Sequence, residues 1–350
     1  MTRIYLDHAA TTPLRPEAAE AVRRGFEIWT NPSSPHAEGR AARAALEDAR
    51  VRVKAALGWE GEVIFTSGAT EALAIGLGRA KAERRLVSAV EHDSVFRAAP
   101  DAGVLPISEG AVDLTALENA LAEPGRAVVA VQSINSETGT VLLPHDDVSV
   151  VTRVRDAGGL FLTDCSQSAG RLPLPDADMI VASAHKLGGP IGIGALLVRD
   201  FAMLEPSGGQ ERGYRQGTEN LPGALGFAAA LEVGGIESWP TSYPDRFEFK
   251  DLVRRGGEVL CLGPQCSHIL AVAHERLSAA ALLIRFDAMG FAVSAGSACS
   301  SGTLKRSRAL EAFGIDEDTA GRTIRVSMGW NTTQAELNAF CEAWQDLGSA

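Results

Sequence analysis

The segments LFLTDCSQ (residues 160–167) and MIVASAHK (residues 179–186) each join a run of apolar, β-prone residues to a short polar stretch. The first run ends in Asp164, and the second is followed by His185 and Lys186. Short apolar runs of this kind are typical of strands that are buried on both faces of a parallel sheet. Because parallel strands place their carboxyl ends at one edge, where α/β folds bind ligands, we expect these polar side chains to lie together.

The rest of the first 233 residues repeats this alternation of strand and helix. Helical spacing of Ala and apolar residues predicts two early helices, near residues 15–29 and 38–57. Further β-prone runs lie at residues 62–66, 85–90, 126–132 and 194–198. The rhythm predicts an α/β fold in which helices wrap a mostly parallel sheet.

The last third of the chain has a different character. An Ala-rich helix is expected at residues 223–233, and residues 234–263 are interrupted by Pro and Gly, which suggests a domain junction. The remainder reads as a small α+β unit, with strands near 269–273, 292–294 and 323–328 and helices near 279–289 and 334–347. We therefore predict a large domain over residues 15–233 and a small one over residues 1–14 and 234–350.

Composition narrows the possible partners. The chain is 45% hydrophobic, but no stretch approaches the roughly 18 apolar residues of a membrane span, and the N-terminus lacks the pattern of a secretion signal. We therefore expect a cytoplasmic protein without a membrane partner. A net charge of −11 with no basic stripe argues against nucleic acid. The five scattered cysteines fit reduced thiols, and we expect no metal site.

Two turns could hold parts of a flat, phosphorylated ligand. Small residues at 66–70 separate a strand from a helix, so backbone N–H groups there could bind a phosphate, although an ordinary strand-to-helix turn is as good an interpretation. Asp164 at a strand end could pair with a protonated pyridine nitrogen, which is how pyridoxal phosphate becomes an electron sink. The alternative role for Asp164 is a helix N-cap.

Lys186 and His92 are candidates for chemistry at the same edge. Of the five lysines, Lys186 alone follows a buried strand, so it could be desolvated enough to act as a neutral amine nucleophile. His92 also follows a predicted strand. A lone histidine is more often structural, but one that converges with Asp164 and Lys186 could stack on a cofactor and relay protons.

Cys299 lies in the run VSAGSACSSG (residues 293–302), which contains small residues and no large side chain. Such a run is typical of an exposed loop rather than of a packed core. Cys299 is therefore the best candidate for a reactive thiol.

Taken together, these motifs resemble those of the cysteine desulfurases of the NifS and IscS type, in the class V group of fold type I pyridoxal-phosphate enzymes. The resemblance runs from Tyr5 to Ser327, nearly the whole chain. It implies a sheet of the seven-stranded type with a small α+β domain, a homodimer, and transfer of sulfur from L-cysteine to a cysteine. The segments that carry it are YLDHAATT (5–12), NPSS (31–34), SGATE (67–71), EH (91–92), Asp164 with Gln167, HK (185–186), residues 211–220 and SAC (297–299).

The resemblance implies a role for each matching residue. Lys186 would carry the cofactor, and Cys299 would take the sulfur as a persulfide while alanine leaves. The remaining expected ligands of the cofactor are His92 against the ring, Asp164 at the pyridine nitrogen, Gln167 at the ring hydroxyl, Asn135 beside the cofactor, and Ala69, Thr70, Ser183, His185 and Thr218 of the partner subunit at the phosphate. Asn31 and Arg325 would hold the substrate carboxylate. The persulfide would serve a scaffold or carrier protein in iron–sulfur cluster assembly or another thiolation.

Two departures from the family pattern leave alternatives open. Ser136 stands where the family usually has Asn, and residues 235–269 form a shorter stretch than usual. One alternative is another reaction of the same fold, such as that of a selenocysteine lyase, a cysteine lyase or an aminotransferase. The other is a relative that binds and regulates a partner without turnover.

Overall fold

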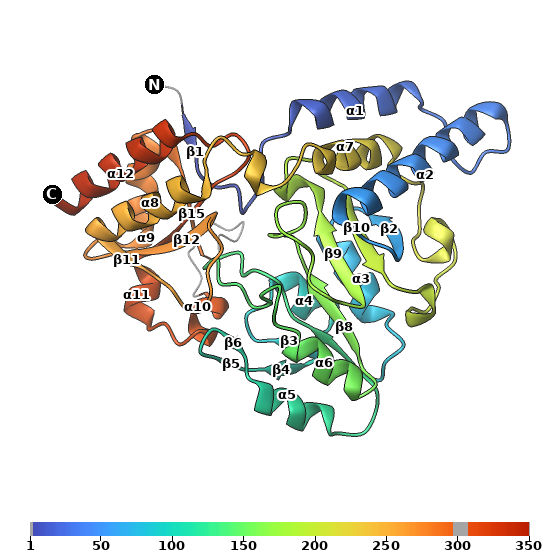
Figure 1. Ribbon diagram of the computed structural model, residues 1–350, viewed down its shortest axis with the longest axis horizontal. Helices are drawn as coiled ribbons and strands as arrows, with labels where there is room; N and C mark the ends of the chain where they lie inside the picture. The colour runs from blue at the N-terminus through green and yellow to red at the C-terminus, as the bar shows by residue number, and fades with distance from the viewer. Residues whose placement is uncertain (1–2, 297–306, 350) are drawn as a thin grey trace.

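The computed structural model describes residues 3–296 and 307–349, and within them seven strands form one large sheet with helices on both faces (Figure 1). In this sheet β10 is antiparallel to its two neighbours, and all the other adjacent pairs are parallel. The predicted α/β fold with a mostly parallel sheet is confirmed. The strand order is β2 (Glu62–Thr66), β10 (Gly194–Val198), β9 (Met179–Ser183), β8 (Leu160–Asp164), β7 (Ala127–Ala130), β3 (Arg84–Ser88) and β4 (Gly103–Leu105).

The central strands are apolar throughout because both of their faces are covered. In β8, Leu160 and Leu162 join one hydrophobic core and Phe161 joins another on the opposite face, as the two-residue period of a strand requires. Helices α3 (Ala69–Gly78) and α4 (Asp93–Ala98) contribute to the first core. The second core includes residues of α1 (Pro16–Glu27), α2 (Ala37–Leu57), α5 (Leu114–Leu121), α6 (Ser149–Asp156) and α7 (Leu221–Glu232).

The edge of the sheet differs from the expectation. Strand β4 pairs in parallel with β3 but was not predicted, because it has three residues and Val104 at its centre is 55% exposed. An edge strand this short carries too weak an apolar pattern to be recognised. A small hairpin of β5 (Ile107–Ser108) and β6 (Ala111–Val112) follows it.

The C-terminal region forms a second unit with its own core. Its antiparallel sheet has the order β11 (Gly257–Val259), β12 (Ile269–His274), β15 (Thr323–Ser327) and β14 (Ser294–Ala295), and β1 (Ile4–Tyr5) pairs with β13 (Phe291–Ala292). Aromatic rings of Phe286, Phe340 and Trp344 stack in its core. Its helices are α8 (Tyr243–Val253), α9 (Ala279–Ala288), α10 (Arg308–Ala312), α11 (Glu317–Gly321) and α12 (Gln334–Ser349).

Residues 234–263, where the sequence predicts a domain junction, contain α8, a helix that was not predicted. Ser242 and Asp245 form a capping box at the start of the helix, and Pro244 occupies the first turn, where the missing N–H costs nothing. Phe249 and Val253, four residues apart, bury the helix against the small core.

Two separate cores support the predicted division at residue 233, which stays a prediction. Leu6 packs in the same core as residues between 236 and 344, although it lies near the N-terminus. Figure 1 likewise draws β1 beside the C-terminal helices and strands.

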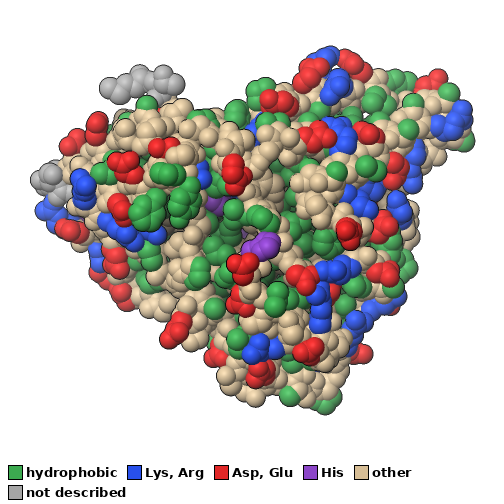
Figure 2. Space-filling view, viewed as in Figure 1, with side chains coloured by type: hydrophobic (Ala, Val, Ile, Leu, Met, Phe, Trp, Pro, Cys, Tyr) green, Lys and Arg blue, Asp and Glu red, His purple; other side chains and the backbone are tan. Residues whose placement is uncertain are grey.

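On the face drawn in Figure 2, basic side chains are interspersed with acidic ones and form no continuous basic surface. Among the helices of the described part of the chain, none is both long and apolar enough to pass through a bilayer.

Candidate active site

The carboxyl ends of the parallel strands border a cavity of about 710 Å³. The large sheet contributes the turns that follow β2, β3, β7, β8 and β9, and the C-terminal unit contributes Ser294, Gly296 and Arg325. This is the edge at which α/β sheets bind ligands. Of the residues predicted for the site, the structure brings nine together in this lining: Ala69, Thr70, His92, Asn135, Asp164, Ser183, His185, Lys186 and Arg325.

The turn between β2 and α3 is built to receive an anion. Gly68 is the N-cap of α3 and adopts a positive φ of 148°, and a Cβ at this position would meet nothing within 4 Å. The first turn of α3, which includes Ala69 and Thr70, has backbone N–H groups that no helical carbonyl can accept. The start of this helix borders the cavity, so these donors and the helix dipole suit a phosphate group.

His185 is far from this turn in the sequence, but both line the same cavity. Its Nδ1 is 3.1 Å from the Thr11 hydroxyl. Burial lowers the pKa of His185 to about 4, and the charge of Lys186 lowers it too, so the ring is neutral at physiological pH. A neutral His185 can contribute a hydrogen bond to a bound anion but no charge.

Lys186 ends the short 3₁₀-helix η1 (Ala184–Lys186), which follows directly on β9. Burial lowers the pKa of the Lys186 amine to about 8; the Asp164 carboxylate raises it, whereas the charges of Arg325 and Arg171 lower it. A lysine with a pKa near 8 has a substantial neutral fraction at physiological pH and can act as a nucleophile or a base.

Asp164 lies at the end of β8, where its Oδ1 accepts a hydrogen bond from the Ser166 N–H at 2.9 Å. Its charge raises the pKa of Lys186, which follows the neighbouring strand β9. The carboxylate borders the cavity and can hold a protonated ring nitrogen there. The alternative N-cap role is wrong, because no helix begins in the described residues between β8 and β9 and the Ser166 contact belongs to a turn.

His92 caps α4, and its Nδ1 accepts a hydrogen bond from the Ser94 N–H at 3.2 Å and lies 2.7 Å from the Ser94 hydroxyl. Desolvation lowers the pKa of His92, and the charge of Lys186 lowers it further. With Nδ1 as acceptor, the neutral ring carries its proton on Nε2. The preceding Glu91 is buried, and burial raises its pKa to about 8.

Arg325 comes from β15 of the C-terminal unit and borders the cavity. Its Nη2 forms an ion pair with Asp7 at 2.8 Å, and its Nη1 donates to the Ser136 carbonyl at 3.0 Å. Its Nε is buried without a hydrogen-bond partner in the described part of the chain. The guanidinium is thus held in place by Asp7 and the Ser136 carbonyl while the residue borders the cavity, where its remaining N–H groups suit a carboxylate. Ser136 contributes through its backbone.

Asn135 also borders the cavity, but its side chain is hydrogen-bonded to backbone groups of its own turn and of the turn after β3. Oδ1 accepts from the N–H groups of Glu137 and Thr138, both at 3.0 Å, and Nδ2 donates to the Val90 carbonyl at 3.2 Å. Asn135 therefore shapes the turn after β7.

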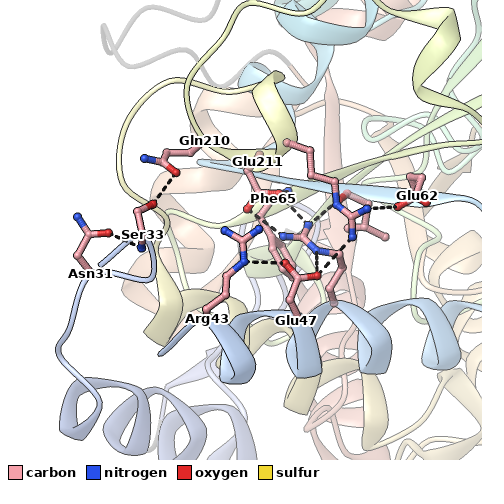
Figure 3. Close-up of polar contacts among 11 residues, drawn as sticks. Asn31, Ser33, Arg43, Glu47, Glu62, Phe65, Gln210 and Glu211 are labelled. Atoms are coloured by element: carbon pink, nitrogen blue, oxygen red, sulfur yellow. Dashed lines mark hydrogen bonds and ion pairs between the residues drawn. The ribbon is translucent and has the colours of Figure 1, made fainter. Parts of the chain in front are cut away.

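Of the four remaining predicted residues, three lie outside the lining and one, Cys299, lies outside the described residues. Gln167 is buried beneath the cavity, where its Nε2 donates to the Ala9 carbonyl at 2.9 Å. Asn31 is exposed, and its Oδ1 accepts from the Ser33 N–H at 2.9 Å, next to the Ser33–Gln210 contact in Figure 3. Thr218 is exposed, as expected of a residue that would serve a partner subunit. Cys299 belongs to residues 297–306, which the structure does not describe.

Sequence reasoning did not identify the partners of these residues. Asp7 pairs with Arg325 across 318 positions of the chain, and no spacing rule connects them. Glu137 borders the cavity and accepts a hydrogen bond from the Ser307 hydroxyl at 2.6 Å. Arg171 donates a hydrogen bond to the Lys186 carbonyl. Only the assembled fold brings these side chains to the site.

Comparisons with known proteins identify the family of the chain. The model of the aminotransferase class-V family matches residues 4–340. A cysteine desulfurase of Cereibacter sphaeroides is 36% identical over 371 residues, which cover 98% of this chain and 95% of that protein. The structure of a NifS-like protein from Rickettsia africae is 27% identical, with a TM-score of 0.86, and the match covers 99% of this chain and 100% of that one.

A further solved structure, described as SspA in complex with cysteine, is 28% identical with a TM-score of 0.78, and the match covers 95% of this chain and 100% of that one. Family match, sequence identity and structural likeness all extend over nearly the whole length. The chain therefore belongs to the class-V aminotransferase family, among the pyridoxal-phosphate-dependent enzymes that include the cysteine desulfurases.

Proposed function

We propose that this protein is a cysteine desulfurase that binds pyridoxal phosphate in the cavity and moves the sulfur of L-cysteine to Cys299. The C–S bond of the substrate breaks and an S–S bond to Cys299 forms. One L-cysteine and one thiol give one L-alanine and one persulfide, so the step needs no external oxidant or reductant. The observation that carries the proposal is that Lys186 lines one cavity together with Asp164, the start of α3 and Arg325.

The residues present fit the cofactor. The free N–H groups at the start of α3, with Ser183 and His185 beside them, suit its phosphate, and Asp164 suits its ring nitrogen. Lys186 is the amine to which it would be joined. When bound, pyridoxal phosphate supplies an electron sink that stabilises negative charge at the substrate Cα.

Lys186 and His92 are the residues that would move protons. The Lys186 amine, once free, takes the proton from the substrate Cα and can return one to the alanine product. His92 presents Nε2 while Ser94 holds Nδ1, and its low pKa keeps it neutral and able to exchange protons.

Arg325 would hold the substrate carboxylate. Asp7 and the Ser136 carbonyl fix two of its nitrogens, and the residue borders the cavity, so its remaining N–H groups could bind a carboxylate there. Asn31 would assist only from a different arrangement of its loop or from a neighbouring copy, since it is exposed here.

Both flanks of the segment that contains Cys299 border the cavity, Gly296 on one side and Arg308 with Ala309 on the other. Glu137 contacts the second flank through Ser307. This placement supports Cys299 as the thiol that takes the sulfur. The persulfide would then pass to a scaffold or carrier protein, for iron–sulfur cluster assembly or other thiolation in the cytoplasm, and the enzyme would act as a homodimer.

The test is to incubate the purified protein with L-cysteine or L-selenocysteine and to measure alanine, sulfide or selenide, and persulfide on Cys299. Alanine and Cys299 persulfide in equal amounts from L-cysteine are expected. Release of selenide at a far higher rate, without dependence on Cys299, would favour a selenocysteine lyase. Cofactor binding without any turnover would favour a regulatory role.

A further inference from the structure

Beneath the cavity, Arg171 is a buried cation without an acidic partner. The residue is 5% exposed, and within residues 3–296 and 307–349 no carboxylate forms an ion pair with it. Its Nε also has no hydrogen-bond partner there. A charge buried in this way is costly, and buried arginines are usually paired. Arg171 therefore needs an explanation beyond packing.

The guanidinium joins the two turns that carry the candidate site. Its Nη1 donates to the Gln167 carbonyl at 2.9 Å and lies 3.4 Å from Gln167 Oε1, in the turn after β8. Its Nη2 donates to the Lys186 carbonyl, in the turn after β9, where the Thr12 hydroxyl donates as well at 2.7 Å. The flat fork of an arginine can hold two acceptors at fixed positions, which an ammonium group cannot.

These contacts fix Lys186, which borders the cavity, and Gln167, which lies outside the lining but contacts one of its residues. With Gln167 Oε1 turned toward Arg171, the amide nitrogen is directed to Ala9, which borders the cavity. The Lys186 carbonyl is fixed, so the starting point of its side chain is fixed as well. Burial lowers the pKa of Arg171 only to about 10, so the residue stays charged at physiological pH.

We propose that Arg171 is a positioning residue, which holds the Lys186 backbone and the Gln167 amide in the arrangement that receives the cofactor. The proposal rests on the proposed role of Lys186 as the residue to which the cofactor is joined. It differs from a packing role, which any buried side chain of similar volume would fulfil.

The structure offers a matched control in Arg246. This arginine is 3% exposed, its guanidinium lies 5.6 Å from the Trp239 ring, and Arg171 lies 5.8 Å from the same ring. Arg246 bonds to the Thr241 carbonyl and the Ser267 hydroxyl, away from the cavity lining. R246M therefore removes a buried guanidinium next to Trp239 without touching Lys186 or Gln167.

The experiment compares R171M, R171K and R246M with the wild type, after thermal unfolding has identified the folded variants. The dissociation constant of pyridoxal phosphate is measured by titration of the visible absorbance. R171M should weaken cofactor binding roughly 10- to 100-fold, the effect expected from lost hydrogen bonds to a charged group. R171K should weaken it several-fold, because lysine keeps the charge but cannot join both carbonyls, and R246M should leave it unchanged.

A second readout uses protein without cofactor. The rate at which an acylating reagent modifies Lys186 is followed against pH, with the site located by peptide mass. The charged groups that act on this amine are Asp164, Arg325 and Arg171. Because Arg171 is one of the two cations, R171M should shift the modification profile of Lys186 to higher pH, and R246M should not.

The outcomes separate this proposal from the proposed function. A folded R171K with wild-type affinity for the cofactor and wild-type reactivity of Lys186 would overturn the positioning role, whether or not R171M folds. If the wild type binds the cofactor but lacks desulfurase activity, while the Arg171 variants lose affinity, the positioning role stands and the proposed reaction fails.

Discussion

The Lys186 amine is the single group on which the proposed joining of the cofactor depends. Its pKa of about 8, lowered by burial, means that the amine gains its nucleophilic neutral form as pH rises through this value. In protein stripped of cofactor, the rate at which pyridoxal phosphate becomes joined should rise about tenfold per pH unit below 8 and level off above it. Stopped-flow absorbance over pH 6 to 10 measures this.

K186A should give no visible absorbance and no turnover, whereas K250A, which changes a lysine of α8, should behave like the wild type. A joining rate that stays flat below pH 8, or persistent colour in K186A, would contradict the assignment of Lys186.

At the residue scale, the sequence predicts positions within a turn but not partners across the fold. Asp164 and Lys186 follow apolar strands, so the pattern that predicts the strands also predicts the edge where they meet. The partner of Arg325 lies on the N-terminal segment, and the acceptors of Arg171 are mostly carbonyl groups, which every residue has. No residue type or spacing marks either contact before the chain is folded.

At the scale of elements, the turn at Gln210–Gly213 depends on a buried ion pair. Glu211 and Arg212 adopt positive φ values of 49° and 57°, which are strained for residues other than glycine. The Glu211 carboxylate accepts from Arg50 at 2.7 Å and from the Phe65 N–H at 2.9 Å, just before the turn into α3 (Figure 3). Both partners are buried, so the pair holds the strained turn against the end of β2.

Replacing Arg50 should leave the Glu211 carboxylate buried and unpaired. R50M is expected to lower the free energy of unfolding by about 3–5 kcal/mol, as for other broken buried pairs. The partly exposed pair of Arg52 and Glu232 is the control, and E232Q should cost no more than about 1 kcal/mol. Urea unfolding followed by circular dichroism measures the free energy of unfolding of both variants. Equal losses of this free energy in R50M and E232Q would show that burial does not make the Arg50 pair more important than an exposed one.

Some secondary-structure elements could not be predicted because their sequence patterns are weak. The strands of the sheet centre are apolar on both faces, and this made them visible in the sequence. Strand β4 is short and half exposed. Helix α8 has a proline in its first turn, and in the sequence this proline suggests a break rather than the start of a helix. Both depend on neighbours distant in the chain: β3 for β4, and the core around Phe340 for α8.

At the scale of the whole molecule, the site has an open side. Ile191 borders the cavity and is 80% exposed, Trp29 is 82% exposed, and Thr218 is exposed and lies outside the lining of this cavity. We predict a homodimer in which Thr218 of the partner subunit completes the phosphate site. Light scattering should give twice the mass of the chain.

T218A should weaken cofactor binding about tenfold without dissociating the dimer, because one hydrogen bond to a charged group is lost. T218S keeps the hydroxyl and should bind the cofactor like the wild type. A monomer that binds the cofactor stoichiometrically would rule out a site shared between subunits.

The proposed sulfur transfer would use groups from both units of the molecule. Lys186 follows a strand of the large sheet, and Arg325 lies in the small sheet. The segment that contains Cys299 is flanked by Gly296, directly after β14, and by Ser307, which contacts Glu137. The thiolate is the form that attacks sulfur, so Cys299 must be deprotonated when the substrate is held in the cavity. A cysteine that served only for packing would need neither to be deprotonated nor to reach the cavity.

We therefore predict that C299S keeps the cofactor absorbance and its change on adding L-cysteine, because the binding groups are untouched. Persulfide and nearly all sulfide should be lost, since serine lacks the sulfur nucleophile. C261S, which changes an exposed cysteine, should keep full activity. If Cys299 only packs, serine is nearly the same size and turnover stays unchanged. Sulfide release by C299S at the wild-type rate would therefore exclude Cys299 as acceptor and make a lyase reaction, with sulfur leaving directly from the substrate, the better account of the site.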